Sequence, residues 1–336
     1  MYKAKTVALT NAFFKNFTGS ELATLDAAKY FLKKGCRVYV FCFSKGGRLM
    51  KAAPGKLKVI NILKQKIPKI KADILYGNHW AVMTKLLADK NFSANKIIHL
   101  SLSPYHEFER EPKYAKLLSK CLGNSWETAQ VRRRENPGLE IQVFNNSVTP
   151  DFFKHHAKPR EHLKSLAIVG NNKVFSPDGE FAKILKARGI NVVFFGFGGV
   201  EKMLTPCDLL QFDAVFTIGR TVQYAMALGI PVFCYDRFGG PGYIKISNWA
   251  ECEKLNYSGR TAICPAGDFE SQLVKNHDVG KIADDLIGGY SEARRDLRSL
   301  RQIARERYDL FKNIESALND LPDSLLARED LGEEIP

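Results

Sequence analysis

The chain has 336 residues, of which 45% are hydrophobic and 26% are charged, and its formal net charge is +14. One ordinary core holds roughly 100 to 200 residues, so this length indicates two domains. The composition excludes a disordered or fibrous protein, and no run of about 18 apolar residues could span a bilayer. The seven cysteines are scattered and form no CxxC pair. They disfavour a disulfide framework and a bound metal, and they indicate a reducing cytosol.

The positive charges are dispersed, with clusters at residues 64–71, 132–134 and 294–307. They would attract acidic lipid surfaces, nucleic acid or phosphorylated substrates, although solvated helix and loop faces are the simpler explanation. A nucleic-acid partner is not expected, because the chain has no helix-turn-helix, zinc-finger or aromatic RNA-binding signature.

Short apolar runs alternate with helical patterns over residues 6–146. Thr18 and Glu21 have the spacing of a capping box, and Gly35 stands where the first helix would end. Strands are expected at 6–10, 37–43, 73–77, 96–102, 121–125 and 141–146, and helices at 18–35, 80–89 and 126–135. Strands that alternate with helices pair in parallel through right-handed crossovers, which predicts a doubly wound, Rossmann-like lobe.

The alternation returns after residues 154–164, a polar stretch with a proline that is typical of a linker. Strands are expected at 165–169, 191–197, 213–219 and 232–235, with helices that begin near Ser176, Thr205 and Thr221 and a terminal helix or helix pair over 291–319. The expected fold is α/β, with two Rossmann-like doubly wound lobes that face a central cleft. The expected domains are residues 1–158, residues 159–300, and a C-terminal helix with a mobile tail over 301–336.

Two turns at strand ends have the composition of phosphate-binding sites. Gly219 and Arg220 end one strand, and unpaired N–H groups of residues 221–223 would begin a helix whose dipole favours an anion. The sequence DRFGGPGY follows the next strand, and Gly239 and Gly240 within it would let the backbone approach a ligand closely. The alternative is that these glycines only make a tight connection.

Several segments, in order, resemble the GT-B type glycosyltransferases, which are retaining sugar-nucleotide enzymes with two Rossmann-like lobes. YAMALGIPV (224–232) is similar to their EAMAxGxPV segment, and FTGSELATLDAAKYFLKKGCRVYVF (17–41) is similar to their glycine loop and first helix. GNSWETAQ and IQVFNNSVTPDFF resemble the passage that closes their first lobe. The stretch from residue 217 to residue 244 also resembles a bacterial subgroup found with polysaccharide genes.

The resemblance implies transfer of a sugar from a nucleotide donor in the C-terminal lobe to an acceptor in the N-terminal lobe, without metal or another cofactor. It implies that the donor is bound by Gly19, Gly170, Asn171, Gly219, Arg220, Thr221, Val222, Gln223, Tyr224, Gly239 and Gly240. Tyr224 stands where the family has the glutamate that grips the donor ribose, and Thr217 stands where it has another glutamate. These departures put a common UDP or GDP sugar in doubt and leave a CMP-linked donor open.

Candidate catalytic residues follow from the need for a base near the acceptor hydroxyl and a positive field near the leaving phosphate. His79, His106 and Glu107 lie on loops of the N-terminal lobe, and a histidine titrates near neutral pH. Arg220 and Lys173 would stabilise the phosphate. Acceptor binding is assigned to Phe17, Thr18, Ser20 and Glu21. A structural role is an equal alternative for His79 and His106.

The expected function is that of a cytoplasmic glycosyltransferase that acts on a glycan or lipid-linked acceptor in bacterial surface polysaccharide synthesis. A peripheral contact with the anionic inner membrane is left open, because each lysine or arginine near such a surface contributes about 1 kcal/mol. A nucleotide-sugar epimerase of the same fold and a catalytically inactive GT-B binding protein are the alternatives.

Overall fold

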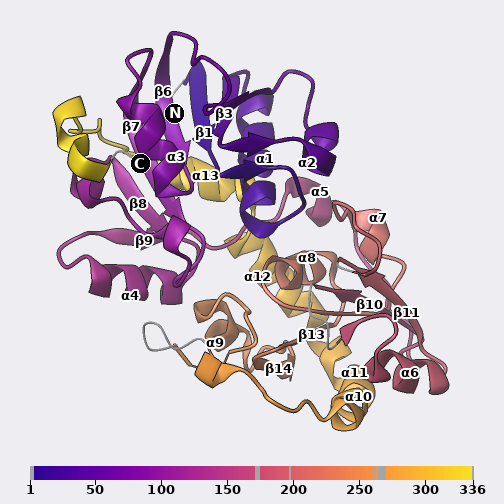
Figure 1. Ribbon diagram of the computed structural model, residues 1–336. Helices are drawn as coiled ribbons and strands as arrows, with labels where there is room; N and C mark the ends of the chain where they lie inside the picture. The colour runs from indigo at the N-terminus through magenta and orange to yellow at the C-terminus, as the bar shows by residue number, and fades with distance from the viewer. Residues whose placement is uncertain (1–3, 171–174, 197, 261, 264–269, 335–336) are drawn as a thin grey trace. The chain divides into compact units, whose positions relative to one another are not determined.

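The computed structural model describes residues 4–170, 175–196, 198–260, 262–263 and 270–334 (Figure 1). The chain divides into two compact units. The first unit comprises residues 1–144 and 314–336, and the second comprises residues 145–313. Each unit is built around its own sheet.

The expected domain boundary after residue 158 is wrong, because residues 145–158 pack within the second unit. The Val148 N–H donates to the Tyr308 carbonyl at 2.6 Å, and the Phe152 ring stacks on Tyr224 with centroids 4.2 Å apart. These contacts join segments far apart in the sequence, so the polar composition of residues 154–164 does not mark the boundary.

The first unit contains a seven-stranded parallel sheet in the order β5-β3-β1-β6-β7-β8-β9. Its strands are β1 (Thr6–Thr10), β3 (Arg37–Cys42), β5 (Lys58–Asn61), β6 (Ile70–Gly77), β7 (Phe92–Ser101), β8 (Lys120–Gly123) and β9 (Ile141–Val143). Two short strands, β2 (Phe13–Phe14) and β4 (Ser44–Lys45), pair separately. The helices are α1 (Gly19–Lys33), α2 (Gly47–Ala52), α3 (Trp80–Ala88) and α4 (Trp126–Glu135), with 3₁₀ turns η1 (Glu107–Glu109), η2 (Lys113–Leu117) and η6 (Arg328–Glu334).

The strand order of the first unit reverses between β1 and β6. The chain runs from β1 through α1 to β3 on one side and from β6 through α3 to β7 on the other. Right-handed crossovers therefore place α1 and α3 on opposite faces of the sheet, which explains why every residue of β1 is buried. As expected, α1 ends before Gly35, which adopts a φ of +84° and donates its N–H to the Leu32 carbonyl.

The second unit contains a five-stranded sheet in the order β11-β10-β12-β13-β14. Its strands are β10 (Ser165–Val169), β11 (Asn191–Phe195), β12 (Ala214–Thr217), β13 (Val232–Asp236) and β14 (Gly239–Tyr243). Its helices are α5 (Pro150–Phe153), α6 (Glu180–Ala187), α7 (Pro206–Leu209), α8 (Arg220–Leu228), α9 (Trp249–Lys254), α10 (Val279–Gly288), α11 (Tyr290–Ala293) and α12 (Leu297–Arg307), with 3₁₀ turns η4 (Glu270–Gln272) and η5 (Arg294–Asp296). Helix α13 (Leu310–Leu318) begins in the second unit and ends in the first.

Alternate residues of the second sheet pack into two separate cores. Leu166 and Ile168 belong to the core covered by α6, whereas Ala167, between them, belongs to the core covered by α8. This period of two follows from the pleat of a strand buried on both faces. The two buried faces confirm the doubly wound arrangement predicted for this part of the chain.

Helix α6 begins later than the sequence pattern suggests. The Gly179 N–H donates to the Ser176 carbonyl at 3.1 Å, so Ser176 and Pro177 form a turn before the helix starts at Glu180. The terminal pattern over 291–319 contains the expected helix pair, α12 and α13, which is interrupted at Tyr308 and Asp309.

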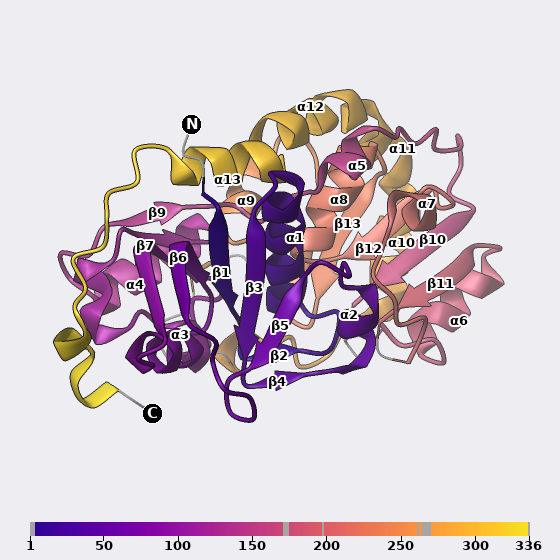
Figure 2. The ribbon, with the colours of Figure 1, turned by 90° about the horizontal axis from the view of Figure 1, so that it is seen from above.

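Residues 320–331, which include the start of the expected tail, pack against the first unit. The Ser324 and Leu325 N–H groups donate to the carbonyls of Asn95 and Leu117, both at 2.9 Å. Figure 2 shows this yellow segment running beside β7. Leu331 is only 3% exposed and packs with the apolar residues around α3. Apolar side chains in a charged segment therefore attach it to the first unit.

No helix within the described ranges is long and apolar enough to cross a membrane. Within the same ranges, no cluster of three or more histidine, cysteine, aspartate or glutamate side chains is arranged to hold a metal ion.

Candidate functional site

In the second unit, Gly170 and Gly219 follow two adjacent strands at the point where the strand order reverses. Val169 of β10 pairs with Thr217 of β12. Gly170 directly follows β10, and Gly219 follows β12 after one intervening residue. The chain leaves β10 toward β11 and leaves β12 toward β13, so this edge is a topological switch point. Open α/β sheets bind ligands outside the carboxyl ends of their strands at such points.

Gly219 makes the sharp entry into α8. Its backbone angles, φ +60° and ψ −137°, lie in a region that residues with a Cβ atom rarely adopt. Its N–H donates to the Tyr257 carbonyl at 2.8 Å, which fixes the entry angle. The Val222 N–H donates to the Gly219 carbonyl at 3.0 Å, so the expectation that this N–H points to a ligand is wrong. A tightened first turn is the reason.

Arg220 and Gln223 place polar groups at the start of α8. Arg220 donates from Nη2 to the Ser147 carbonyl at 3.1 Å, and its guanidinium carbon lies 5.3 Å from the centre of the Tyr224 ring. Gln223 is 2% exposed, and its Oε1 has no hydrogen-bond partner within the described part of the chain. A buried amide oxygen without a partner is costly, which makes it a candidate for ligand contact. Thr221, the next predicted donor-binding residue, is half-buried in the same turn.

Tyr224 and Thr217 do not replace the carboxylates of the resembling family. Tyr224 is 7% exposed and stacks on Phe152 in the apolar core. Thr217 donates its hydroxyl to the Val169 carbonyl at 2.8 Å. A hydroxyl cannot accept two hydrogen bonds from a ribose as a carboxylate does, and the Tyr224 ring is held in the core by packing.

The expected glycine loop after β13 is a strand. Gly239 and Gly240 belong to β14, which pairs antiparallel with β13 in a hairpin. A Cβ atom on Gly240 would lie 2.0 Å from the Cys234 carbonyl oxygen, so glycine is needed for this close pairing. The alternative explanation, a tight connection, therefore accounts for Gly240.

Two arginines that the sequence did not single out lie at the carboxyl end of β13. The turn between β13 and β14 consists of Arg237 and Phe238. The guanidinium carbons of Arg237 and Arg260 lie 4.9 and 5.6 Å from the Phe238 ring centre. Because β13 neighbours β12, these charges follow the strand beside Gly219. The predicted residues Asn171 and Lys173 lie outside the described residues.

In the first unit, the loop before α1 is fixed by Glu21. Its Oε1 accepts the Lys15 and Asn16 N–H groups at 2.6 and 3.0 Å, and its Oε2 accepts the Thr18 hydroxyl at 2.6 Å. The carboxylate is 2% exposed. Glu21 and Thr18, both predicted to bind the acceptor, are therefore engaged with their own loop. Gly19, at the first position of α1, is exposed.

The other two predicted acceptor residues flank this start. Phe17 and Ser20 are both partly exposed. The Ser20 carbonyl accepts the Thr24 hydroxyl at 2.9 Å, so this backbone group is also engaged.

His79 lies at the switch point of the first unit, and both of its ring nitrogens are engaged. Nδ1 accepts the Ala12 N–H at 2.8 Å, which places the proton of the neutral ring on Nε2. Nε2 lies 3.0 Å from Oε1 of Glu109. His79 is 6% exposed with a φ of +60°, so its geometry favours a structural role over that of a base.

His106 and Glu107 lie together at the surface of the same unit, after β7. The His106 Nδ1 accepts the Phe108 N–H at 3.3 Å, and the Glu107 carboxylate pairs with Arg110 at 2.9 Å. Because β6 and β7 are adjacent, the structure brings these residues near His79, whose ring centre lies 6.0 Å from that of Phe108. This proximity follows from the pairing of β6 with β7.

Arg132 of α4 holds the loop that carries His106, although the sequence pattern indicated only a member of a basic cluster. Its Nη2 donates to the Ser103 and His106 carbonyls at 2.9 and 3.1 Å, and its Nη1 pairs with Glu135 at 2.7 Å. Arg132 is 3% exposed, so these bonds are shielded from water. Its Nε lies 3.8 Å from the Glu111 carboxylate.

Two titratable groups near Arg132 are buried without full hydrogen bonding. His99, on β7, has no partner for either ring nitrogen within the described ranges, and burial lowers its pKa to about 4. Burial raises the pKa of Glu111 to about 7, although the Arg132 charge opposes this shift. Burial thus favours the neutral form of both groups.

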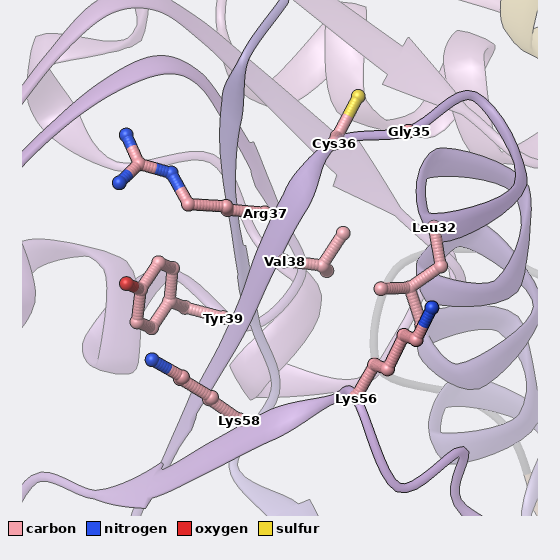
Figure 3. Close-up of a pocket in the computed structure, with 8 residues that line it drawn as sticks. All are labelled: Leu32, Gly35, Cys36, Arg37, Val38, Tyr39, Lys56 and Lys58. Carbon is pink, nitrogen blue, oxygen red and sulfur yellow. The ribbon is translucent and has the colours of Figure 1, made fainter.

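A cavity of about 230 Å³ lies at the opposite end of the first sheet, around the amino end of β3. Figure 3 shows Arg37, Tyr39 and Lys58 on one side of the strand and Leu32 and Lys56 on the other. These basic groups do not converge, and the cavity lies away from the carboxyl ends of the strands. It is not part of the candidate site.

The comparisons with known proteins identify the fold. No family model and no curated protein matches the chain. A glycosyltransferase from Rickettsia africae ESF-5 is similar over 99% of both chains, with 14% identity and a TM-score of 0.56. S. aureus TarM, in complex with fondaparinux, α-GlcNAc-glycerol and UDP, covers 94% of this chain and 99% of its own, with 10% identity and a TM-score of 0.60. AviGT4, a glycosyltransferase involved in avilamycin A biosynthesis, covers 94% and 96%, with 11% identity and a TM-score of 0.51.

These likenesses establish the α/β fold of the GT-B glycosyltransferases, with two Rossmann-like units. Identities of 10 to 14% carry the fold and not the reaction.

Proposed function

We propose that the chain is a glycosyltransferase that moves a sugar from a nucleotide-sugar donor to a glycan or lipid-linked acceptor. The observation that best supports this proposal is the switch point of the second unit. There Gly219 turns the chain into α8, next to Arg220 and to the Gln223 side-chain oxygen, which has no partner within the described residues. A helix start with an adjacent guanidinium suits a diphosphate. The full-length likeness to glycosyltransferases of this fold supports the assignment.

The proposed chemistry needs positive charge where the leaving phosphate develops. Arg220 follows β12, and Arg237 follows β13. Arg260 packs on Phe238, in the turn between β13 and β14. Fixed guanidinium groups stabilise an anion without reorganising during the reaction. The proposal therefore requires no metal, and these side chains take the role that a metal ion would have.

The proposed setting is the cytoplasmic face of a bacterial inner membrane, in synthesis of a surface polysaccharide such as lipopolysaccharide or capsule. The net charge of +14 supports attraction to anionic headgroups. The TarM complex contains UDP and α-GlcNAc-glycerol, which supports a nucleotide sugar and a glycan as the kinds of partner. The proposal does not specify the donor nucleotide, since Tyr224 stands where the resembling family has the glutamate that binds the donor ribose.

Tyr224 also supports a second candidate, an inactive GT-B binding protein. Its ring is held in the core by Phe152, so no carboxylate can reach a ribose from this position. Such a protein would bind a nucleotide sugar or glycan without turnover.

Calorimetry with UDP, GDP, CMP and ADP tests the proposal. We expect one nucleotide to bind, and Arg220→Ala to weaken that binding at least about tenfold, since a charge-assisted contact contributes about 1.5–3 kcal/mol. Arg188→Ala is the matched control, because Arg188 pairs with Asp284 on the surface of the same unit. Equal binding by Arg220→Ala and the wild type would contradict the placement. A donor that binds and is never consumed with any acceptor would favour the inactive protein.

A further inference from the structure

We group Trp80, at the start of α3, with His106 and Phe108 at η1 as one aromatic cluster of the first unit, because the Trp80 indole N–H bonds to the backbone between these two rings. The His106 and Phe108 rings stack, with centroids 5.7 Å apart and planes 26° apart. Phe108 is 38% exposed, so part of its ring faces solvent. The cluster follows β6 and β7 at their carboxyl ends, next to His79.

The rings of this aromatic cluster are held in place by specific contacts. Trp80 donates its indole N–H to the Glu107 carbonyl at 3.2 Å, and the Arg110 guanidinium carbon lies 4.6 Å from the Trp80 ring centre. Below the cluster, the buried Arg132 binds the carbonyls of the loop that leads to His106. A ligand would therefore meet rings that are already ordered, which lowers the entropic cost of binding.

The charges around the aromatic cluster favour a neutral polar ligand. Glu107 and Arg110 pair at 2.9 Å, so they supply an acceptor and donors without a net charge. A nucleoside diphosphate would meet the exposed Glu107 carboxylate, and an anionic membrane would need an excess of cations. A sugar ring fits better, because its C–H face stacks on the electron-rich face of an aromatic ring while its hydroxyls bind charged side chains.

We propose that the aromatic cluster is the binding platform for a pyranose ring of the acceptor, with Phe108 as its main contact. This inference rests on the proposed function and names the part of the acceptor that the enzyme grips. It moves the acceptor role from Thr18 and Glu21, which bind one another, to the loops after β6 and β7. His106 then contributes a stacking face rather than a base.

Titration of neutral methyl pyranosides, followed by tryptophan fluorescence and by NMR of the sugar, tests this platform. We expect Phe108→Ala to weaken pyranoside binding about tenfold or more, and Phe108→Trp to retain it. Leu63→Ala, which alters another exposed apolar side chain of the same unit, is the control and should change nothing. Nucleotide binding in calorimetry should be the same in all three variants.

The outcomes separate this inference from the proposed function. Failure of every pyranoside to bind the wild type, or equal binding by Phe108→Ala, overturns the platform even where a nucleotide binds. Loss of binding to phosphatidylglycerol vesicles in Phe108→Ala, with pyranoside binding unchanged, also overturns it and identifies a membrane contact. Pyranoside binding without any nucleotide binding supports the platform and counts against the transferase.

Discussion

Glu111 should make the stability of the first unit depend on pH, and Glu111→Gln should remove the part of that dependence that comes from this carboxyl. The carboxyl is buried, its Oε1 has no hydrogen-bond partner within the described residues, and burial raises its pKa from 4.5 to about 7. The folded state then keeps a proton that the unfolded state releases above pH 4.5. Raising the pH therefore favours unfolding, and the stabilisation present below pH 4.5 is lost as the pH passes 7.

The size of the effect follows from the shift. A change from 4.5 to about 7 corresponds to about 3 kcal/mol in the free energy of unfolding, of which about 2–3 kcal/mol falls between pH 5 and pH 8. His99 acts in the opposite direction, because burial lowers its pKa to about 4 and the unfolded state binds its proton first. The contributions of Glu111 and His99 to the free energy of unfolding offset one another below pH 6.5. Only the difference in stability between the wild type and Glu111→Gln therefore isolates the contribution of Glu111.

Urea unfolding at several pH values measures this difference. In a Trp249→Phe background, the two remaining tryptophans, Trp80 and Trp126, both report on the first unit. We expect the stability of the wild type relative to Glu111→Gln to fall by about 2–3 kcal/mol from pH 5 to pH 8. Glu107→Gln is the control, since its side chain is 77% exposed. If the free energies of unfolding of the wild type and Glu111→Gln changed with pH in the same way, the reasoning would be refuted.

Two further substitutions test the packing around the candidate site. We expect Gly240→Ala to destabilise the second unit by about 1–3 kcal/mol in thermal unfolding, because the new methyl group would lie 2.0 Å from the Cys234 carbonyl; Gly288→Ala, which meets open space, should be neutral, and equal melting of both variants would contradict the hairpin. We expect Arg132→Leu to cost about 3–5 kcal/mol in urea unfolding, since it removes the guanidinium beside the buried Glu111 carboxyl and its hydrogen bonds to the Ser103 and His106 carbonyls. Arg134→Leu, on the exposed side of the same helix, should cost little. A small effect of Arg132→Leu would show that other contacts hold the loop.

The order of strands and helices could be predicted because it depends on local apolar patterns. Residues 165–169 form β10 and residues 126–135 form α4, both as the pattern indicates. Strand β14 could not be predicted in this way, since glycine and proline disfavour strands and only pairing with β13 stabilises one there. Tertiary contacts outweighed local propensity at that position.

The polar contacts of the candidate site were less predictable, because their partners are distant in the sequence. His79 is bonded to residues 67 and 30 positions away, and no local pattern shows that both of its nitrogens are engaged. Arg132 looked like part of a basic run, yet it is buried and binds carbonyls 26 and 29 residues away. Gly219 was predictable, since a strand, a glycine and a helix in succession already demand a sharp turn.

The polar groups at the two switch points are engaged differently. This difference bears on the proposal that the second unit binds the donor and the first unit binds the acceptor. In the first unit, Glu21 binds its own loop and His79 binds Ala12 and Glu109 on neighbouring loops, so what remains for a ligand is mostly aromatic surface. In the second unit, the Gln223 oxygen has no partner within the described residues, and arginines lie near the ends of two adjacent strands. A charged donor suits the second arrangement and a neutral sugar suits the first, so the chemistry of each unit supports the assignment made to it.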